Sequence, residues 1–273
     1  FIMYDEMLNR NREASNKLYK KLYSWLHDQN SSTLLNQSIK AEELFRKVGI
    51  TFNVYGNDKA EERLIPFDLI PRIIEKKEWE FVKKGIIQRL KALNLFLKDI
   101  YFDQKILKDG IIPSKLINNN SAFKPQMCGF KPPGGIYIHV SGVDLIRTSK
   151  KNFYVLEDNL RVPSGSSYMI ENRSTMMHMF PELFTRYNVK NVYDYPDLLF
   201  KSLIKCYGSH SGTPNLAVLT PGIYNSAYFE HSFLADEMGV NLLEWRDLII
   251  DNNKIVIKTT KGKEIIDILY RRI

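Results

Sequence analysis

The stretch that decides the fold runs over residues 135–167 and reads GIYIHVSGVDLIRTSKKNFYVLEDNLRVPSGSS. Apolar residues recur through 136–146 and again through 153–156. The polar run 148–152 between them is typical of a turn. The pattern therefore predicts two antiparallel strands joined as a hairpin.

A two-residue turn at 150–151 sets the register that we expect for these strands. That turn places Ile146 opposite Val155 and Asp144 opposite Glu157. Directly opposed side chains have Cβ atoms roughly 5 Å apart. A turn one residue longer or shorter would undo the facing of the two carboxylates, because successive side chains point to opposite faces.

Three oxygen donors then meet at one end of the predicted hairpin. Asn159 lies two residues past Glu157 and so points to the same face, beside Asp144. Unpaired carboxylates repel each other, and a hard divalent cation resolves that conflict. Mg²⁺ takes oxygen ligands of this kind, usually with a nucleotide phosphate in its shell. The alternative is that these residues are solvated at a strand end or form a turn.

The segment that follows resembles the metal-binding end of ATP-grasp enzymes, in which an E-x-N pair is followed closely by Pro, Gly and Ser or Thr. Further segments are similar to a narrower group, the circularly permuted ATP-grasp family related to glutathionylspermidine synthases, and the resemblance runs over residues 49–273. These segments are FNVYG (52–56), IPFDLIPRII (65–74), FKPQMCG (123–129), PPGGIYIH (132–139), YVLEDNLRVPSGSSYMIENR (154–173) and LTPGIYNSAYFEHSFLADEMG (219–239).

The resemblance implies an enzyme that joins a carboxylate to an amine. ATP phosphorylates the acid, and the amine attacks the resulting acylphosphate. ATP and Mg²⁺ are the implied cofactors, and a small-molecule or peptide acid and an amine are the implied substrates. The residues that the resemblance assigns to Mg²⁺ are Asp144, Glu157 and Asn159.

Other residues receive roles from the same resemblance. Arg161 and Arg147 are candidates for contacting the phosphoryl group, because a guanidinium is a permanently charged bidentate donor. Arg147 is predicted on the face opposite Asp144, so a surface position is its alternative. Ser164 and Gly165 are expected to shape the loop beside the metal and to contribute to cofactor binding.

Two acidic residues are candidates for substrate binding. Glu171 is expected to bind the amine or to cap its own helix. Glu230, with His231 beside it, is expected to contribute to substrate binding, with a surface position as the alternative. The sequence departs from the glutathionylspermidine synthase pattern at Gly142, where that family has Arg, which leaves the oxyanion-binding arginine and the identity of both substrates open.

The second half of the chain predicts an open α/β unit. A strand at 216–219, a helix at 226–238 and a strand at 240–244 follow in order, before a hairpin at 254–268. Ligands bind beyond the carboxyl ends of strands in such sheets. That rule places Asn225, Ser226 and Tyr228 beside a ligand, with Ser226 as a helix N-cap the alternative.

The fold class that we expect is α+β and α/β together: N-terminal helices, an antiparallel part of a permuted ATP-grasp fold, and the start of an open α/β unit. The predicted domains are 1–48, 49–207 and 215–273. Helices are expected at 5–29, 37–48, 79–108, 167–184 and 196–206, and a strand at 50–55.

Composition narrows the class of protein. The chain has 273 residues, 44% of them apolar, which is typical of a folded globular protein. Apolar runs fall short of the roughly 20 residues that span a membrane, and no signal peptide is recognisable. Two cysteines favour a reducing, cytoplasmic setting. The net charge of +8 suits phosphate ligands or nucleic acid, but no basic run interleaved with aromatic residues supports nucleic-acid binding.

The nucleotide-clamping lysines of the permuted family follow its α/β unit, and this sequence ends before that point. We therefore expect an N-terminal part of a longer protein, inactive by itself. A non-catalytic module that binds a nucleotide or a partner is the alternative function, and a nucleic-acid-binding protein is a third. The oligomeric state stays open.

Overall fold

The computed structural model describes residues 4–9, 11–53, 62–208 and 212–273, and this part of the chain forms two compact units. The hairpin unit contains residues 74–163 and Tyr4. The sheet unit contains the described residues of 5–73 and 164–273. The domain boundaries drawn from the sequence stay a prediction. The last three residues of FNVYG and residues 209–211 of the expected linker lie outside the described residues.

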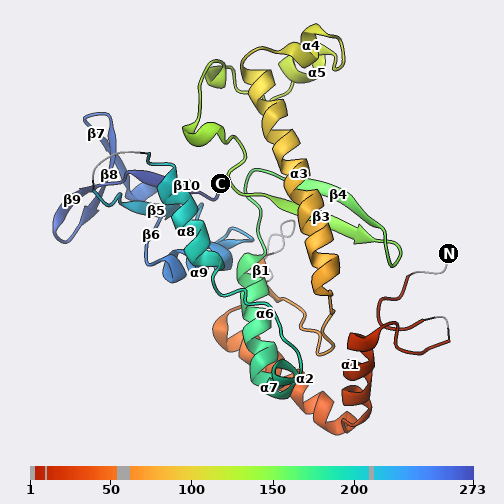
Figure 1. Ribbon diagram of the computed structural model, residues 1–273. Coiled ribbons are helices and arrows are strands. Elements are labelled where there is room, and N and C mark those ends of the chain that lie inside the picture. Colours follow the sequence, from red (N-terminus) through yellow and green to blue (C-terminus); the bar gives the residue numbers. More distant parts are fainter. Residues whose placement is uncertain (1–3, 10, 54–61, 209–211) are drawn as a thin grey trace. The chain divides into compact units, whose positions relative to one another are not determined.

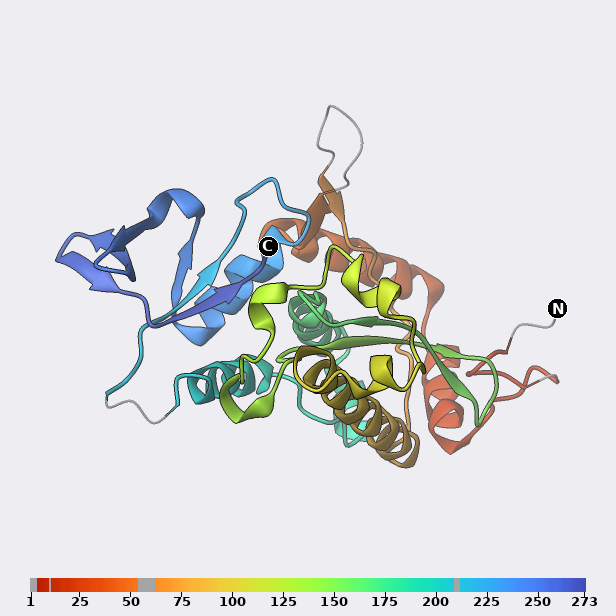
Figure 2. The same ribbon diagram turned by 90° about the horizontal axis from the view of Figure 1, so that it is seen from above.

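In the hairpin unit, the helix α3 (Lys76–Tyr101) packs against the antiparallel strands β3 (Gly142–Arg147) and β4 (Phe153–Asn159). Figures 1 and 2 both show α3 running beside this hairpin. The chain between them forms the short helices α4 (Lys105–Lys108), α5 (Ser114–Asn118), η1 (Pro125–Met127) and η2 (Pro133–Gly135).

The prediction of one helix over 79–108 is wrong at its carboxyl end. The helix α3 stops at Tyr101, and Gln104 adopts a left-handed conformation with φ +52°. The carboxylate of Asp99 accepts hydrogen bonds from the backbone N–H groups of Lys105 and Ile106, at 3.0 Å each. Asp99 therefore caps the start of α4, and this contact divides the expected helix into two.

In the sheet unit, helices that are far apart in the sequence share one apolar core. These helices are α1 (Lys17–His27), α2 (Ser31–Val48), α6 (Ser166–Met179) and α7 (Pro181–Arg186). The expected helix 5–29 is shorter because Asn16 caps it, and the expected helix 167–184 is broken at Phe180, before Pro181. The buried residues of this core are Tyr19, Leu22, Trp25, Ala41, Met176, Met179, Phe180 and Leu183.

The α/β part of the sheet unit agrees with the sequence. The strands β5 (Leu216–Leu219), β6 (Asn241–Leu243) and β10 (Ile268–Arg271) form a parallel sheet in the order β10-β5-β6. The helix α9 (Tyr228–Met238) contacts β5 and β6, and α8 (Tyr195–Lys205) contacts β10 and α9. The mixed α/β architecture that the sequence predicted is confirmed.

Two further sets of strands complete the sheet unit. A second, antiparallel sheet consists of β7 (Leu248–Asp251), β8 (Lys254–Thr259) and β9 (Gly262–Ile265), and β7 was not expected. The short strands β1 (Thr51–Asn53) and β2 (Glu62–Leu64) pair antiparallel. None of the helices in the described part of the chain is both long and apolar enough to cross a membrane.

A buried histidine holds the loop that leaves β5. The Nδ1 atom of His231 lies 2.8 Å from Oγ1 of Thr220, and the same Oγ1 accepts a hydrogen bond from the N–H of Gly222 at 3.2 Å. His231 and Thr220 are 2% and 1% exposed. Burial, helped by the positive charge of Arg272, lowers the pKa of His231 to about 4. The imidazole is therefore neutral in the folded protein at pH 7.

This pKa predicts a loss of stability in mild acid. Unfolded histidine, with a pKa near 6.5, binds a proton as the pH falls, whereas folded His231 stays neutral until about pH 4. The free energy of unfolding should drop across that window by up to about 3 kcal/mol, at about 1.4 kcal/mol per pKa unit. Urea unfolding at a series of pH values measures this slope. His231→Asn should flatten it, and an unchanged slope in the variant would contradict the assignment.

Candidate functional site

The two strands of the hairpin unit bring the predicted metal ligands together. Asp144 pairs directly with Glu157, and Gly142 pairs with Asn159, in the antiparallel register of β3 and β4. The expected facing of the two carboxylates is therefore confirmed. Asp144, Glu157 and Asn159 are all exposed to solvent.

The turn that leads to this register differs from the expected one. A hydrogen bond of 3.2 Å from Thr148 N to Asn152 O closes a five-residue connection between the strands. Ile146 consequently pairs with Tyr154, so the predicted pairing of Ile146 with Val155 is wrong.

A β-bulge restores the register beyond the turn. The pairing shifts between Leu145 and Asp144, and Leu156 is the extra residue on β4. A bulge adds one residue to one strand, so it cancels the one-residue offset that the longer turn introduces. Asp144 and Glu157 thus face each other because two departures from the expected hairpin compensate.

The other face of β4 is held by an ion pair. The carboxylate of Asp158 accepts three hydrogen bonds of 2.6–3.0 Å from the guanidinium of Arg89, a residue of α3. These bonds lower the pKa of Asp158. Because side chains alternate along a strand, fixing Asp158 toward α3 turns Glu157 and Asn159 outward. Arg89 was not among the predicted site residues, and the signal for it in the sequence is the position of Asp158 between two predicted ligands.

The three donors suit a hard cation. Nδ2 of Asn159 donates a hydrogen bond of 3.1 Å to Oε1 of Glu157, so the amide and that carboxylate are in contact. Asp144 adds a second carboxylate from the adjacent strand. The site therefore has two carboxylates and one amide. Over the described ranges, no group of three or more His, Cys, Asp or Glu residues is placed to hold a metal ion. Two carboxylates and an amide oxygen are the donors that Mg²⁺ accepts, and they leave room for phosphate oxygens and water.

Arg147 lies in the interior of the hairpin unit. Its guanidinium bonds the carboxylate of Glu78 in α3 and the carbonyl oxygens of Ser149 and Lys150, and it lies 4.9 Å from the ring centroid of Phe153. The side chain is only 5% exposed. The alternative of a surface position is therefore wrong, and the contacts brace the turn of the hairpin against α3.

Gly142 has a steric reason to be glycine. A Cβ atom at this position would lie 2.9 Å from Cβ of Pro163 and 3.7 Å from Cβ of Asn159. The chain that leaves β4 therefore returns across β3 at the point where Asn159 pairs with it. The arginine that the related family carries here has no room in this structure.

Gly142→Ala should therefore destabilise the protein. Forcing the new methyl group against Pro163 should cost about 1–3 kcal/mol, the usual range for overpacking. Gly85→Ala is the matched control, because Gly85 lies in α3 with no atom within 4 Å of an added Cβ. That control should stabilise the protein by about 0.5–1 kcal/mol through helix propensity. Urea unfolding that moves both variants in the same direction would contradict the contact.

In the sheet unit, Glu230 forms the centre of a buried network at the start of α6. Its Oε2 atom accepts hydrogen bonds from the N–H groups of Gly165 at 2.6 Å and Ser167 at 3.1 Å, and from Oγ of Ser167 at 3.0 Å. Its Oε1 atom accepts a hydrogen bond of 2.9 Å from Nη2 of Arg272. The Glu230 and Arg272 side chains are each 1% exposed.

The network explains how α6 begins. Its N-cap residue is Gly165, which has φ +120° and no side chain to satisfy the free N–H groups. Glu230 supplies the missing acceptor from α9, at the helix end where a negative charge is favourable. The expected alternative of a surface position for Glu230 is wrong. Gly165 was expected to shape the cofactor-binding loop, and its N–H donates to Glu230 within the protein, whereas Ser164 beside it is exposed.

Glu230→Ala should unfold the sheet unit at a much lower urea concentration. The variant leaves the buried guanidinium of Arg272 without its carboxylate, a loss that typically costs about 3–5 kcal/mol. Glu237→Ala, on an exposed position of the same helix, should change the free energy of unfolding by less than about 0.5 kcal/mol. Equal stability of the two variants would contradict the structural role of Glu230.

The remaining predicted substrate residues lie near α6 and α9. Glu171 is in the middle of α6, so the alternative that it caps the helix is wrong. Its pKa is raised, first by burial and then by the charge of Glu237. The N-cap of α9 is Ala227, whose N–H bonds Oδ1 of Asn225 at 2.9 Å. Ser226 is therefore not the N-cap.

The loop between β5 and α9 lies at the carboxyl ends of the parallel strands. Asn225 and Ser226 are half-buried between the end of β5 and α9, and Tyr228 is the half-buried first residue of α9. A Cβ added to Gly222 would lie 3.3 Å from the carboxylate of Glu244, which follows β6. The structure thus brings the loop and the end of β6 together at the expected edge of the sheet.

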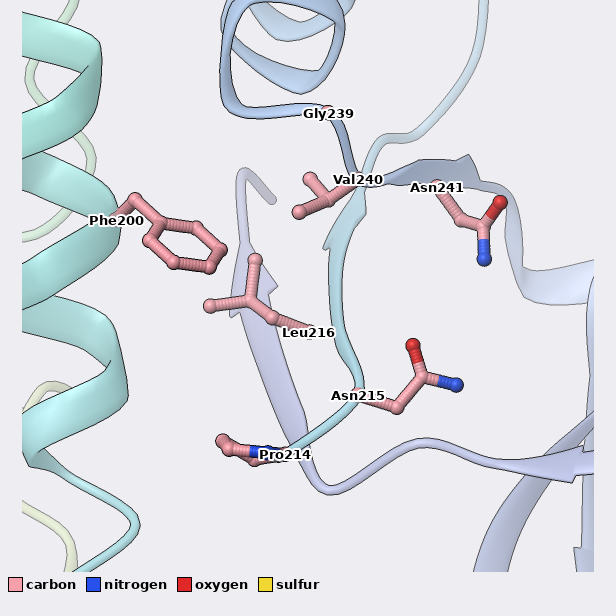
Figure 3. Close-up of a pocket in the computed structure, with 7 residues that line it drawn as sticks. All are labelled: Phe200, Pro214, Asn215, Leu216, Gly239, Val240 and Asn241. Carbon is pink, nitrogen blue, oxygen red and sulfur yellow. The ribbon is translucent and has the colours of Figure 1, made fainter. Parts of the chain in front are cut away.

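A small pocket of about 200 Å³ lies at the opposite edge, beside the amino ends of β5 and β6. Figure 3 shows the side chains of Phe200, Leu216 and Val240 gathered on one side, with the amides of Asn215 and Asn241 turned away from them. None of the predicted site residues lines this pocket.

A solved structure shares the fold. The structure of a glutathione synthetase-like effector from Globodera pallida, in the apo form, matches 90% of this chain and 59% of that chain, with a TM-score of 0.55 and 12% sequence identity. At this identity the match shows that the two chains share a fold.

The family model described as a circularly permuted ATPgrasp matches residues 71–273. The chain belongs to the circularly permuted ATP-grasp family, as the resemblance had predicted.

Relatives with longer chains match most of the sequence. An uncharacterised protein of Synechocystis sp. is 45% identical over 92% of this chain and 52% of its own length. An uncharacterised protein of Mycobacterium tuberculosis is 46% identical over 93% of this chain and 46% of its own. A putative glutamate–cysteine ligase of Frankia alni is 36% identical over 99% of this chain and 31% of its own. The chain thus spans about half the length of the first two relatives, and about a third of the third.

Proposed function

We propose that the protein is an ATP-dependent carboxylate–amine ligase, or carries the metal-binding part of one. The observation that carries this proposal is the direct pairing of Asp144 with Glu157, with Asn159 bonded to Glu157 on the same exposed face. Membership of the circularly permuted ATP-grasp family and the similarity to putative glutamate–cysteine ligases support it.

The residues of the hairpin unit fit Mg²⁺ and, through it, ATP. Asp144, Glu157 and Asn159 would hold the cation, which when bound would offset the charge of the ATP phosphates during phosphoryl transfer. Arg161 is exposed just beyond β4 and is our candidate for contacting the transferred phosphoryl group. Ser164, also exposed, is the candidate for lining the same loop.

The substrates that we propose are a small-molecule or peptide acid and an amine. The loop at the carboxyl end of β5, with Asn225, Ser226 and Tyr228, is the proposed substrate-binding part, because ligands of open α/β sheets bind at that edge. Glu171 is the proposed partner of the amine. We place the reaction in the cytoplasm, because Cys128 and Cys206 are both free thiols.

Glu157→Gln in the complete gene product should abolish ATP turnover. The substitution removes one carboxylate charge from the proposed metal site, and ADP release with panels of amino acids, small peptides and polyamines should fall by about 100-fold or more. Glu157 is exposed, so the free energy of unfolding should change by less than about 0.5 kcal/mol.

The matched control is Glu43→Gln, an equally conservative change at an exposed carboxylate of α2. Its ADP release should stay within about twofold of the wild type. Turnover that survives Glu157→Gln would refute the metal assignment. A wild-type protein that binds Mg²⁺–ATP but releases no ADP with any acid and amine would instead favour a non-catalytic binding module.

A further inference from the structure

The positive charge of the chain is concentrated in one segment. Residues 76–141 contain 12 Lys and Arg against 5 Asp and Glu, a net +7 of the total +8. The helix α3 opens this segment and is the longest helix in the described part of the chain. The surface of α3 that faces away from β3 and β4 is therefore the strongest candidate for an electrostatic interaction.

On that outer surface, lysine recurs at every seventh position. One row consists of Lys77, Lys84, Lys91 and Lys98, all exposed. The adjacent row consists of Phe81, Gln88, Leu95 and, just past the helix end, Phe102. Phe81 and Leu95 are each 66% exposed, although both are large and apolar. We call these two rows the α3 stripe.

The lysines of the α3 stripe have no acidic partner in the described part of the protein, whereas the acidic residues of α3 are all engaged elsewhere. Glu78 bonds Arg147, Glu80 pairs with Lys83 at 3.6 Å, and Asp99 caps α4. The stripe therefore presents uncompensated positive charge around exposed apolar side chains.

We propose that the α3 stripe is a docking surface for an acidic amphipathic helix of a partner protein. A seven-residue repeat along one helix matches the repeat of a second helix packed along it, because heptad-spaced residues form a continuous seam. Lysines seven residues apart are separated by about 10 Å along the axis, the same interval as acidic residues one heptad apart on the partner.

The shape of the stripe also suits a helix. Gly85 and Ala92 are exposed beside the row of Phe81 and Leu95, and no atom lies within 4 Å of a Cβ added to Gly85. These small residues leave shallow positions into which apolar side chains of a partner helix fit, while Phe81 and Leu95 project between them. The apolar contacts give affinity, and the lysines select an acidic partner.

Two other occupants fit less well. A second copy of this chain would bring one lysine row against another, and like charges at this spacing repel. An anionic membrane surface favours a helix with a continuous apolar face, whereas Gln88 interrupts the apolar row of the stripe and the lysines run along its full length.

The test is binding of a synthetic 28-residue peptide helix, with leucine at its seam positions and glutamate flanking them, to the complete protein. Fluorescence anisotropy at low salt should show saturable binding. The double variant K84E/K91E should weaken it by about tenfold or more, and F81S/L95S by a similar factor. The control K201E/K205E makes the same charge change at exposed positions of α8 and should weaken binding by less than about twofold.

Circular dichroism melting confirms that each variant is folded before its affinity is compared. No saturable binding of the acidic peptide would overturn the proposal. Equal weakening by K201E/K205E would also overturn it, because net charge alone would then explain the binding. Binding of phosphatidylserine vesicles through Lys84 and Lys91, without binding of the peptide, would replace the partner helix with a membrane surface. These outcomes do not depend on whether the protein is a ligase.

Discussion

The register between β3 and β4 is the constraint on which the candidate site depends. A slip of one residue would turn Glu157 and Asn159 to the other face of the hairpin and away from Asp144. Contacts on the face opposite the proposed metal ligands hold this register. Arg89 binds Asp158 on that face, and Arg147 ties the turn end of the hairpin to Glu78.

The two faces of the hairpin therefore have different roles: one packs on α3, and the other carries the proposed metal ligands. On the inner face of the hairpin, Asp158 and Arg147 each form an ion pair with a residue of α3 in the same unit. The outer face brings together the carboxylates of Asp144 and Glu157 and the amide of Asn159. Among the described residues, neither carboxylate has a cationic partner. Two carboxylates that a fold places side by side on a strand pair repel each other, and a bound cation relieves that repulsion, which is the physical basis of the proposed Mg²⁺ site.

The sheet unit contributes a second, independent constraint. Glu230 joins the start of α6 to Arg272 beyond β10, and α6 follows the loop that leaves β4. The buried pair thus fixes one end of that loop within the sheet unit. Thr220, His231 and Gly222 fix the loop that leaves β5 in a similar way, through a neutral imidazole. The loop after β4 is thus held by Glu230, which is far from it in sequence. The loop after β5 is held by His231, which burial keeps uncharged.

Local pattern predicted a large part of this structure. The strand Leu216–Leu219 and the glycine that ends α9 followed from apolar runs and turn residues. The facing of Asp144 and Glu157 was also predicted, although the turn was wrong and the bulge at Leu156 corrected the error.

Contacts between distant residues could not be predicted in this way. Arg89 is 69 residues from Asp158, and Glu230 is 63 residues from Ser167, so no periodicity connects them. The burial of Glu230 was missed because a glutamate in the first turn of a helix is usually a solvated residue. The break of the long helix at Tyr101 depended on the side chain of Asp99, which capped a new helix instead of continuing the old one.

The most direct measurement is a crystal structure of the complete protein with Mn²⁺ and a non-hydrolysable ATP analogue, using the anomalous signal of the metal. We predict an anomalous peak about 2.2 Å from carboxylate oxygens of Asp144 and Glu157, next to the amide of Asn159 and the phosphates of the analogue. A nucleotide-bound metal peak at any other group of residues, with these three side chains in contact only with water, would contradict it.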